Sequence, residues 1–422
     1  MLARIHPARR GVEGRIEAPP SKSYTHRALL TALLATGESK IWNPLLSGDT
    51  IATLNAARKL GARVRRNKGY ISIEGVSGSP GSPPWIYCRA SGTTMRLVTA
   101  ISSLGSGPTV IYGDESLNRR PMKPLIDSLT SIGVKVLSRE GYPPLAVKGP
   151  LKHASRVTIN PKHSSQYVSA LLLISPVAGL EINVVGSLVS RPYIDITLSV
   201  MKVFGARVER EGYRYFRPLN QGYRSVEYRV PGDYSSAAFI LAAGAIAGKV
   251  FVSGLDPSDP QPDKAILGVL DSMGARVSWV DDGVLVEGGG ILEPVEVDLS
   301  DSPDLAPIVA VLAAYARGTS KIRGVGHLRF KESDRIKAIV DNLSRIGVDA
   351  RAYEDMIEVY GKGFVRGGVV KSYRDHRIIM AMSIAALRAE SPIIVRGFER
   401  HRDSYPGFLD DLRRLGVFVE VG

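Results

Sequence analysis

A short phrase centred on glycine recurs six times along the chain, at intervals of roughly 70 residues. It first reads Leu60-Gly61-Ala62-Arg63-Val64, and the glycine returns in the same setting at five later positions: Gly133, Gly205, Gly274, Gly347 and Gly416. Each glycine follows an amphipathic helical pattern and precedes the alternating pattern of a hairpin. Glycine ends a helix in the left-handed conformation at little cost. The chain is therefore predicted to contain six copies of one compact unit.

The other half of each unit contains a polar loop that opens an apolar helix. The six loops are Ser21-Lys22-Ser23, Ser91-Gly92-Thr93-Thr94, Ser164-Ser165-Gln166, Asp233-Tyr234-Ser235-Ser236, Ser302-Pro303-Asp304 and Asp375-His376-Arg377. The helices that follow are apolar on nearly every side, which predicts burial. The unit reads βαβαββ, so we expect an α/β protein of two lobes, each with three units, buried helices and mixed sheets. The boundary between the lobes is expected near Tyr223–Gly232.

Composition favours a cytoplasmic protein. The chain has 422 residues, 44% of them hydrophobic, which suffices for two or more domains. Cys88 is the only cysteine, so no intramolecular disulfide is expected. The first residues lack the apolar segment of a secretion signal, and the longest apolar runs, such as 168–174 and 237–247, are too short to span a membrane.

The formal net charge of +14 suits either a nucleic acid or a small substrate with several negative charges. There is no long run of Lys and Arg, and aromatic residues do not interleave with basic ones along the chain, which favours the small anion. The sequence contains no metal-ligand spacing, no Walker loop and no Gly-x-Gly-x-x-Gly after a strand. We therefore expect neither a metal nor a cofactor.

Several loops combine cations with helix starts, as anion sites do. Lys22 and Arg27 flank the start of the first apolar helix, where unpaired N–H groups face a ligand. Arg120 precedes another helix start. In the second half, Asp304 and Glu332 lie in polar segments beside Lys and Arg, where a carboxylate stays ionised and can move protons. Taken singly, each of these stretches also fits an ordinary helix cap or a solvated ion pair.

Together, these motifs resemble those of the 3-phosphoshikimate 1-carboxyvinyltransferase (EPSP synthase) family. The matching segments occur in the family's order over nearly the whole chain: Pro19–Arg27, Gly92-Thr93 through Arg96, Arg120-Pro121, Ser164-Ser165-Gln166, Lys331-Glu332-Ser333-Asp334-Arg335 and Asp375-His376-Arg377. The resemblance implies the inverse α/β barrel of enolpyruvyl transferases. It also implies an N-terminal lobe over residues 20–228, which binds shikimate 3-phosphate, and a C-terminal lobe over 1–19 and 229–422, which carries the acid–base and phosphoenolpyruvate residues.

The resemblance implies transfer of the enolpyruvyl group of phosphoenolpyruvate to the 5-hydroxyl of shikimate 3-phosphate, in chorismate and aromatic amino acid biosynthesis by the shikimate pathway. The residues at the positions that hold shikimate 3-phosphate are Lys22, Ser23, Arg27, Ser164, Ser165, Gln166, Ser190, Tyr193, Asp304 and Lys331. Those at the phosphoenolpyruvate positions are Lys22, Gly92, Arg120, Gln166, Arg335 and Arg377. By the same match, Asp304 takes the hydroxyl proton, and Glu332 with Lys22 moves the proton at the methylene carbon.

Three positions depart from the family pattern. Ala90 stands where many members have Asn, and His327 replaces an Asn found in some relatives. The family's lysine near the C-terminal Tyr-Pro falls on Asp403, and neither His401 nor Arg402 is assigned in its place.

Two alternatives remain open from the sequence. One is a UDP-N-acetylglucosamine enolpyruvyl transferase, although that family has Lys-Asn where Lys22-Ser23 stands. The other is a nucleic-acid-binding or RNA-end-processing protein of the same repeat. The expected partners are small anionic substrates, without nucleic acid or membrane, and the expected state is a monomer.

Overall fold

The computed structural model describes residues 1–151 and 156–422, which group into two lobes. The N-terminal lobe is Pro20–Val230, and the C-terminal lobe combines Met1–Pro19 with Pro231–Gly422. Each lobe has its own hydrophobic core. Within the C-terminal lobe, the N–H of Asp233 donates to the carbonyl of Pro19 at 2.8 Å, which holds the two crossing segments side by side.

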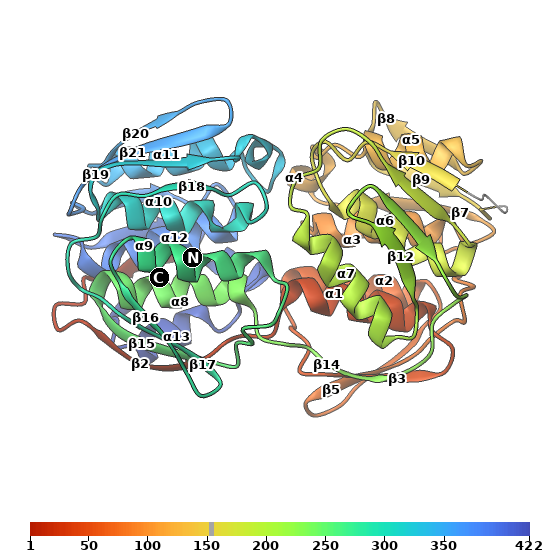
Figure 1. Ribbon diagram of the computed structural model, residues 1–422, viewed down its shortest axis with the longest axis horizontal. Coiled ribbons are helices and arrows are strands. Elements are labelled where there is room, and N and C mark those ends of the chain that lie inside the picture. Colours follow the sequence, from red (N-terminus) through yellow and green to blue (C-terminus); the bar gives the residue numbers. More distant parts are fainter. Residues whose placement is uncertain (152–155) are drawn as a thin grey trace. The chain divides into compact units, whose positions relative to one another are not determined.

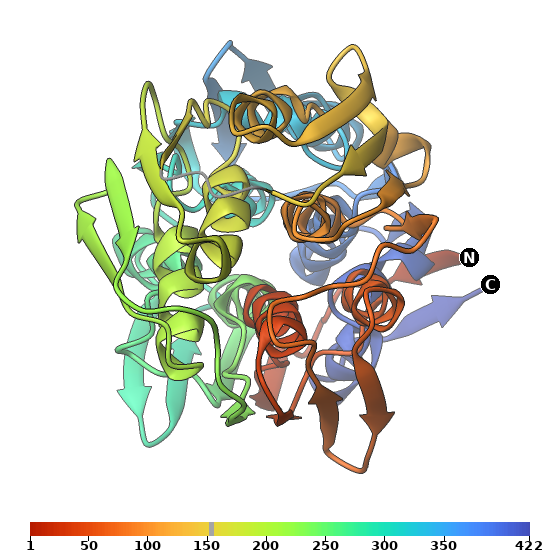
Figure 2. The ribbon, with the colours of Figure 1, turned by 90° about the vertical axis from the view of Figure 1, so that its right-hand side faces the viewer.

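Six buried helices begin at the six polar loops or within one turn of them, as the sequence predicts. They are α1 (Lys22–Leu34), α3 (Gly92–Ser102), α6 (Gln166–Ala178), α8 (Tyr234–Ala247), α10 (Ala306–Ala314) and α12 (His376–Ala385). All 14 residues of α8 are buried, because its Ala, Ile, Leu and Phe side chains leave no polar face. Figure 2 shows the helices of the N-terminal lobe end-on, with the strands on the outside.

A second helix in each unit ends at the recurring glycine. These helices are α2 (Gly48–Lys59), α5 (Lys123–Ser131), α7 (Pro192–Val203), α9 (Ile266–Ser272), α11 (Arg335–Arg345) and α13 (Phe408–Arg414). The six glycines have φ between +81° and +109°, a region that residues with a Cβ rarely adopt. The predicted helix ends are confirmed. One further short helix, α4 (Glu115–Asn118), precedes α5.

Each unit contains a four-stranded sheet (Figure 1). The strands of the N-terminal lobe are β3 (Glu38–Trp42), β4 (Arg63–Arg66), β5 (Tyr70–Glu74), β6 (Trp85–Tyr87), β7 (Pro108–Tyr112), β8 (Lys135–Arg139), β9 (Tyr142–Lys148), β10 (Arg156–Ile159), β11 (Glu181–Val184), β12 (Val208–Glu211), β13 (Tyr215–Pro218) and β14 (Glu227–Arg229). Its sheets have the orders β14-β3-β5-β4, β6-β7-β9-β8 and β10-β11-β13-β12.

The strands of the C-terminal lobe are β1 (Leu2–Ile5), β2 (Val12–Glu17), β15 (Gly248–Ser253), β16 (Arg276–Val280), β17 (Gly283–Glu287), β18 (Glu296–Asp298), β19 (Arg317–Arg323), β20 (Asp349–Ala352), β21 (Met356–Lys362), β22 (Gly368–Lys371), β23 (Ile393–Arg396) and β24 (Val419–Val421). Its sheets have the orders β2-β15-β17-β16, β18-β19-β21-β20 and β22-β23-β1-β24. In all six sheets the first pair is parallel and the other pairs are antiparallel, as a βαβ crossover followed by a hairpin requires.

Three units are completed by a strand from elsewhere in the chain. The strand before the first polar loop, β2, pairs with β15 of the C-terminal lobe rather than with β3. The strand before α8, β14, pairs in parallel with β3 of the N-terminal lobe. Strand β1 is the third strand of the last sheet, where it lies between β23 and β24. Every sheet therefore has four strands in the folded protein, although in three of them one strand comes from a distant part of the sequence. Among the described residues, no helix is long and apolar enough to cross a membrane.

Candidate active site

Lys22 stands at the first position of α1, where the sequence predicts an anion site. Its Nζ lies 3.2 Å from Oδ2 of Asp49, at the start of α2. Both side chains are largely buried, with exposed fractions of 15% and 10%. This ion pair fixes the Lys22 ammonium group beside the N-terminal ends of α1 and α2. Asp49 was not predicted as a site residue, because nothing in the local sequence distinguishes it from a helix-capping acid.

A second group of N-terminal lobe residues meets at the start of α3. The Arg96 guanidinium donates to Oε1 of Gln166 at 2.6 Å, and Nε2 of Gln166 donates to Oγ1 of Thr93 at 3.1 Å. A Cβ on Gly92 would lie 2.9 Å from guanidinium nitrogens of both Arg96 and Arg120. The glycine therefore gives room for two arginines to converge, which creates a site for a phosphate or carboxylate.

Arg27 is buried and bonded to the protein on several sides. Its Nε donates to Thr197 at 2.7 Å, and its other nitrogens donate to the carbonyls of Ser23 and Tyr193 and to the hydroxyl of Ser169. Burial lowers the pKa of Arg27 to about 10, although nearby tyrosines oppose this shift. Four of its five N–H groups are thus used to join α1, α6 and α7. As a ligand residue it has one N–H left to offer.

The remaining predicted residues of this lobe lie at the starts of α1, α6 and α7. Ser23 follows Lys22 on α1, and the Ser164 hydroxyl accepts the N–H of Gln166 at 3.2 Å, next to the buried Ser165. Ser190 has φ +55°, and its carbonyl accepts the N–H of Tyr193 at 3.3 Å. A serine in the left-handed region is strained, a feature that clusters at functional sites.

The six polar loops do not cap their helices uniformly. Ser91 and Asp375 each accept a backbone N–H at the start of α3 and α12, at 3.2 and 3.0 Å. The N-cap side chains of α1, α6 and α8 make no capping hydrogen bond: Ser21, Ser165 and Asp233. These three side chains therefore do not act as helix caps.

In the C-terminal lobe, Asp304 lies at the centre of a group of cations. Its Oδ1 is 2.7 Å from Nη1 of Arg335, and its Oδ2 is 2.7 Å from Nη2 of Arg377. Nζ of Lys331 lies 4.0 Å from Oδ1 of Asp304, and Nη2 of Arg335 lies 2.6 Å from Oε2 of Glu332. All five predicted site residues of this lobe are thus brought together at the starts of α10, α11 and α12.

Asp375 completes this group and was not predicted as a site residue. Its side chain is fully buried; Oδ2 lies 2.8 Å from Nε of Arg335 and accepts the Ser333 hydroxyl at 3.1 Å. The Asp375 carboxylate therefore fixes the position of the Arg335 guanidinium. The sequence does show Asp375 as the first residue of a polar helix-entry loop, but an acid at that position is also typical of a helix cap.

These contacts control the charge states. Burial raises the pKa of Asp304, but Arg377, Lys331 and Arg335 together lower it far below its ordinary value. Burial lowers the pKa of Arg335, and the carboxylates Asp375, Glu332 and Asp304 raise it by more. Three carboxylates and three cations balance in this cluster, which we call the Asp304 cluster: Asp304, Glu332, Lys331, Arg335, Asp375 and Arg377.

The residues that depart from the family pattern offer no replacement for the missing lysine. His401 is buried, its Nδ1 lies 2.9 Å from the carbonyl of Tyr405, and burial lowers its pKa. Arg402 is exposed, and Asp403 pairs with Arg400 at 3.4 Å. Ala90 and the buried His327 lie beside the starts of α3 and of the Lys331 segment.

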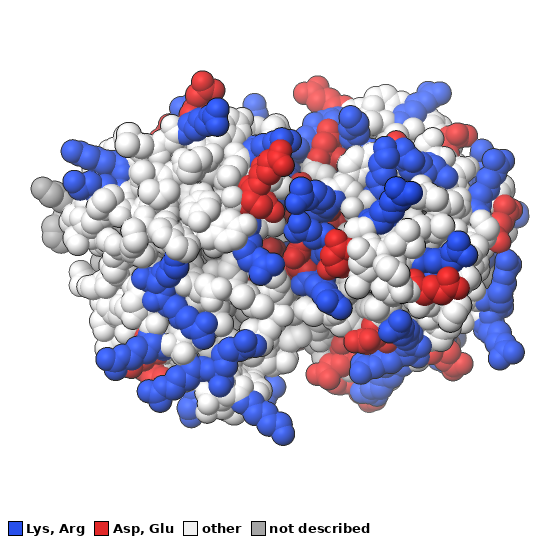
Figure 3. All heavy atoms as spheres, turned by 180° about the vertical axis from the view of Figure 1, so that it is seen from behind, with Lys and Arg blue, Asp and Glu red and all other residues white. Residues whose placement is uncertain are grey.

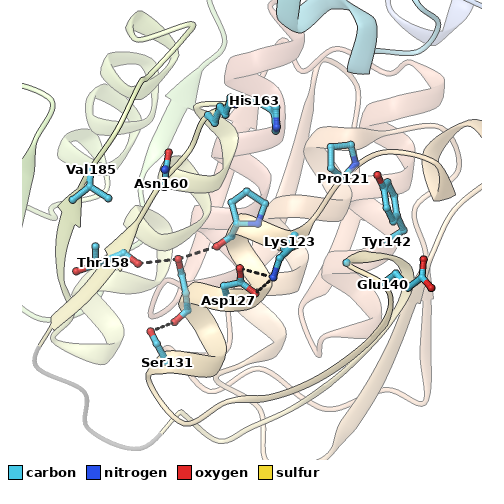
Figure 4. Close-up of a pocket in the computed structure, with 14 residues that line it drawn as sticks. Pro121, Lys123, Asp127, Ser131, Glu140, Tyr142, Thr158, Asn160, His163 and Val185 are labelled. Atoms are coloured by element: carbon cyan, nitrogen blue, oxygen red, sulfur yellow. Dashed lines mark hydrogen bonds and ion pairs between the residues drawn. The ribbon is translucent and has the colours of Figure 1, made fainter.

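A pocket of about 690 Å³ in the N-terminal lobe is lined by residues of α5, β10 and the segments beside them (Figure 4). Pro121 and His163 on its wall are the sequence neighbours of Arg120 and Ser164. The ammonium of Lys123 lies 3.0 Å from each carboxylate oxygen of Asp127, which neutralises that cation. None of the predicted site residues lines this pocket, so it is a neighbour of the candidate site and not part of it.

Comparison with known proteins decides the family. The model of the family described as EPSP synthase (3-phosphoshikimate 1-carboxyvinyltransferase) matches residues 7–412. The chain belongs to the EPSP synthase family. It is 52% identical over 417 residues to the 3-phosphoshikimate 1-carboxyvinyltransferase of Aeropyrum pernix, covering 99% of this chain and 96% of that protein. It is 49% identical to the enzyme of that name from Thermococcus kodakarensis, covering 96% and 98% of the two chains.

Solved structures confirm the fold expected for an EPSP synthase. The EPSP synthase of Acinetobacter baumannii superposes with a TM-score of 0.83 at 29% identity, covering 100% of this chain and 99% of that one. The enolpyruvyl transferase NikO of Streptomyces tendae gives 0.77 at 20% identity over 99% and 98% of the chains, a likeness of fold alone. The prediction of the family and of the enolpyruvyl transferase fold is confirmed.

Proposed function

We propose that this enzyme transfers the enolpyruvyl group of phosphoenolpyruvate to the 5-hydroxyl of shikimate 3-phosphate and releases phosphate. The observation that carries the proposal is the difference in charge between the two groups of site residues. In the N-terminal lobe, Lys22, Arg27, Arg96 and Arg120 are accompanied by one carboxylate, Asp49. We call the site residues of this lobe the N-terminal group. In the Asp304 cluster, carboxylates and cations are equal in number. The first group therefore attracts polyanions, and the second is suited to proton transfer.

The N-terminal group is assigned to binding. Lys22, Ser23, Arg27, Ser164, Ser165, Gln166, Ser190 and Tyr193 hold shikimate 3-phosphate, joined by Asp304 and Lys331. Lys22, Gly92, Arg120 and Gln166 hold phosphoenolpyruvate, joined by Arg335 and Arg377. The convergence of two guanidiniums over Gly92 supports this assignment, since paired guanidiniums suit phosphate and carboxylate oxygens.

The Asp304 cluster is assigned to the chemistry. The 5-hydroxyl gives its proton to Asp304 while its oxygen bonds to C2 of phosphoenolpyruvate, and Glu332, with Lys22, protonates the methylene carbon. The tetrahedral intermediate then loses a proton from that carbon and expels phosphate. Without substrate, Asp304 is a weak base because three cations surround it. An anionic substrate that neutralises those cations raises its basicity when a base is needed.

The substrates are small anions of chorismate biosynthesis, and we place the reaction in the cytoplasm. The test measures phosphate release from phosphoenolpyruvate with shikimate 3-phosphate, with UDP-N-acetylglucosamine or with no acceptor. Release that requires shikimate 3-phosphate supports the proposal. Release with UDP-N-acetylglucosamine alone identifies the related transferase, and release with no acceptor refutes both.

A further inference from the structure

The outer face of one sheet in the N-terminal lobe differs from its five counterparts. Along β6, β7 and β9 alternate residues point away from the core, as their burial patterns show, and the edge strand β8 is exposed over most of its length. Six large apolar or aromatic side chains lie on this face: Trp85, Tyr87, Val110, Tyr112, Leu137 and Tyr142. Five of them are between 40% and 74% exposed, and Tyr112 is partly buried. We call this surface the β6–β9 face.

The aromatic rings on this face are contiguous. Tyr87 and Tyr112 are paired in register on neighbouring parallel strands, and their ring centres are 5.1 Å apart. The ring of Trp85 lies 6.2 Å from that of Tyr112. Three exposed or half-exposed rings thus form one platform at the edge of the sheet.

The other five sheets provide an internal comparison, because the six units share one architecture. The four strands of the β6–β9 face contain no Asp or Glu. Each of the other sheets has at least one ion pair between neighbouring strands: Lys40–Glu227, Arg156–Glu181, Lys249–Glu287, Arg323–Glu296 and Arg4–Glu420. The unit therefore folds with a solvated, ion-paired outer face, and the aromatic platform is not needed for folding.

The cations of the β6–β9 face have no carboxylate opposite them. Lys135 and Lys148 are directly paired in register on β8 and β9, a like-charge arrangement that costs stability. Within the described residues, neither forms an ion pair. Lys59 lies over the Trp85 ring, 2.8 Å from its centre. An anion bound along this face removes the repulsion between the lysines.

The charge of the whole lobe has the same sign. Residues 20–230 contain 28 Lys and Arg against 12 Asp and Glu, a formal charge of +16. The remaining residues contain 27 against 29, a charge of −2. In Figure 3 the N-terminal lobe, on the left, shows mostly blue charged side chains, whereas blue and red mix on the other lobe. The positive charge of the protein is therefore a property of this lobe.

We propose that the β6–β9 face binds single-stranded nucleic acid, with bases stacked on Trp85, Tyr87 and Tyr112 and phosphates paired with Lys59, Lys135 and Lys148. An exposed aromatic platform on a four-stranded sheet, bordered by cations, is a surface on which unpaired bases stack and backbone phosphates find counter-charges. A groove of about 740 Å³ lined by Arg119, Arg139 and Tyr142 continues the face at its far edge.

A second copy of the chain fits this face less well, since two such faces bring only cations together. The inference does not depend on the proposed enzymatic function, because none of these residues belongs to the candidate active site. No nucleic acid was expected from the sequence, because cations and aromatic residues do not interleave along the chain. The fold brings them together from positions between 59 and 148.

The test uses the full-length protein and fluorescein-labelled oligouridylate and oligothymidylate of about 12 nucleotides, with a duplex of equal length. Fluorescence anisotropy is measured between about 50 and 200 mM salt. We expect the single strands to bind more tightly than the duplex, and the double variant Trp85→Ala/Tyr87→Ala to lose about 10- to 100-fold in affinity. The double variant Lys135→Gln/Lys148→Gln lowers the slope of log K against log salt by about 1.4.

The matched control is Trp42→Ala, which removes an outward aromatic from the ion-paired sheet of the same lobe, where Nε1 of Trp42 donates to Glu227. Its affinity should stay within about twofold of the wild type, well below one stacked base. Phosphate release by all variants reports that they are folded. Absence of single-strand binding at low salt, or equal losses in Trp42→Ala and the platform variant, overturns the inference. So does sedimentation that shows a dimer dissociated by Trp85→Ala/Tyr87→Ala.

Discussion

Replacing Asp304 by Asn tests the charge balance of the Asp304 cluster. The substitution keeps the shape of the side chain and removes one of three negative charges that face three cations. Arg335 and Arg377 are only 1% and 5% exposed, so water cannot compensate for the lost carboxylate. Breaking a buried ion pair by removing one partner costs about 3–5 kcal/mol. Because Asp304 is itself 19% exposed and Asn still accepts hydrogen bonds, we expect a loss of about 2–4 kcal/mol.

The assay combines thermal unfolding with turnover. A loss of this size lowers the unfolding midpoint by about 5–15 °C in a lobe of this length. Turnover should fall by about 10²–10⁴, the usual range for loss of a general base. Inorganic phosphate should stabilise Asp304→Asn more than the wild type, because an anion replaces the missing charge among the cations.

The control is Asp334→Asn in the same segment. Asp334 caps α11 through the N–H of Lys337 at 3.1 Å, and its ion pair with Arg329 is about one-third exposed. We expect this substitution to cost no more than about 1 kcal/mol, because Asn caps a helix about as well as Asp and a partly exposed ion pair contributes little. If Asp304→Asn unfolds at the same temperature as Asp334→Asn, and phosphate stabilises wild type and variant equally, the cluster does not depend on Asp304 for its charge balance.

Three further outcomes follow from single contacts. Gly92→Ala places a Cβ 2.9 Å from the guanidiniums of Arg96 and Arg120, so KM for phosphoenolpyruvate should rise about 10- to 100-fold with little loss of stability; an unchanged KM contradicts the anion site. Arg27→Lys loses most of the bonds that join three helices and should unfold about 2–4 kcal/mol more easily in urea, whereas a wild-type midpoint shows these bonds to be dispensable. His26 is buried, and burial followed by two neighbouring cations lowers its pKa well below 6.5. The unfolded chain binds a proton near pH 6.5 that the folded chain does not, so stability should decrease as pH falls below 6.5, by at most about 1.4 kcal/mol per pH unit. Urea titrations of His26→Gln should show a smaller slope, and equal slopes refute the assignment.

The repeated glycine allowed most of the fold to be predicted, because a glycine after an amphipathic helix has few alternatives to a left-handed helix end. The burial of α8 and α10 followed from their composition in the same way. The exchange of β2 and β14 between units was not predictable from periodicity. Both strands have an ordinary alternating pattern, and only their pairing with β15 and β3 shows where they belong.

The candidate site was predicted through its loops, and the structure adds the residues that hold them. Asp49 and Asp375 act on Lys22 and Arg335, which lie 27 and 40 residues away in sequence. A contact of that range leaves no local pattern. The β6–β9 face was missed for the same reason, since its rings and lysines meet only when four separate strands pair and α2 packs beside β6.

In the proposed function, the N-terminal group supplies most of the substrate contacts and the Asp304 cluster moves the protons. The most direct measurement is the dissociation constant of shikimate 3-phosphate for Glu332→Gln, obtained by titration calorimetry beside the turnover of the same variant. We expect a dissociation constant within about threefold of the wild type and turnover reduced at least about 100-fold. A loss of affinity that matches the loss of turnover would contradict it.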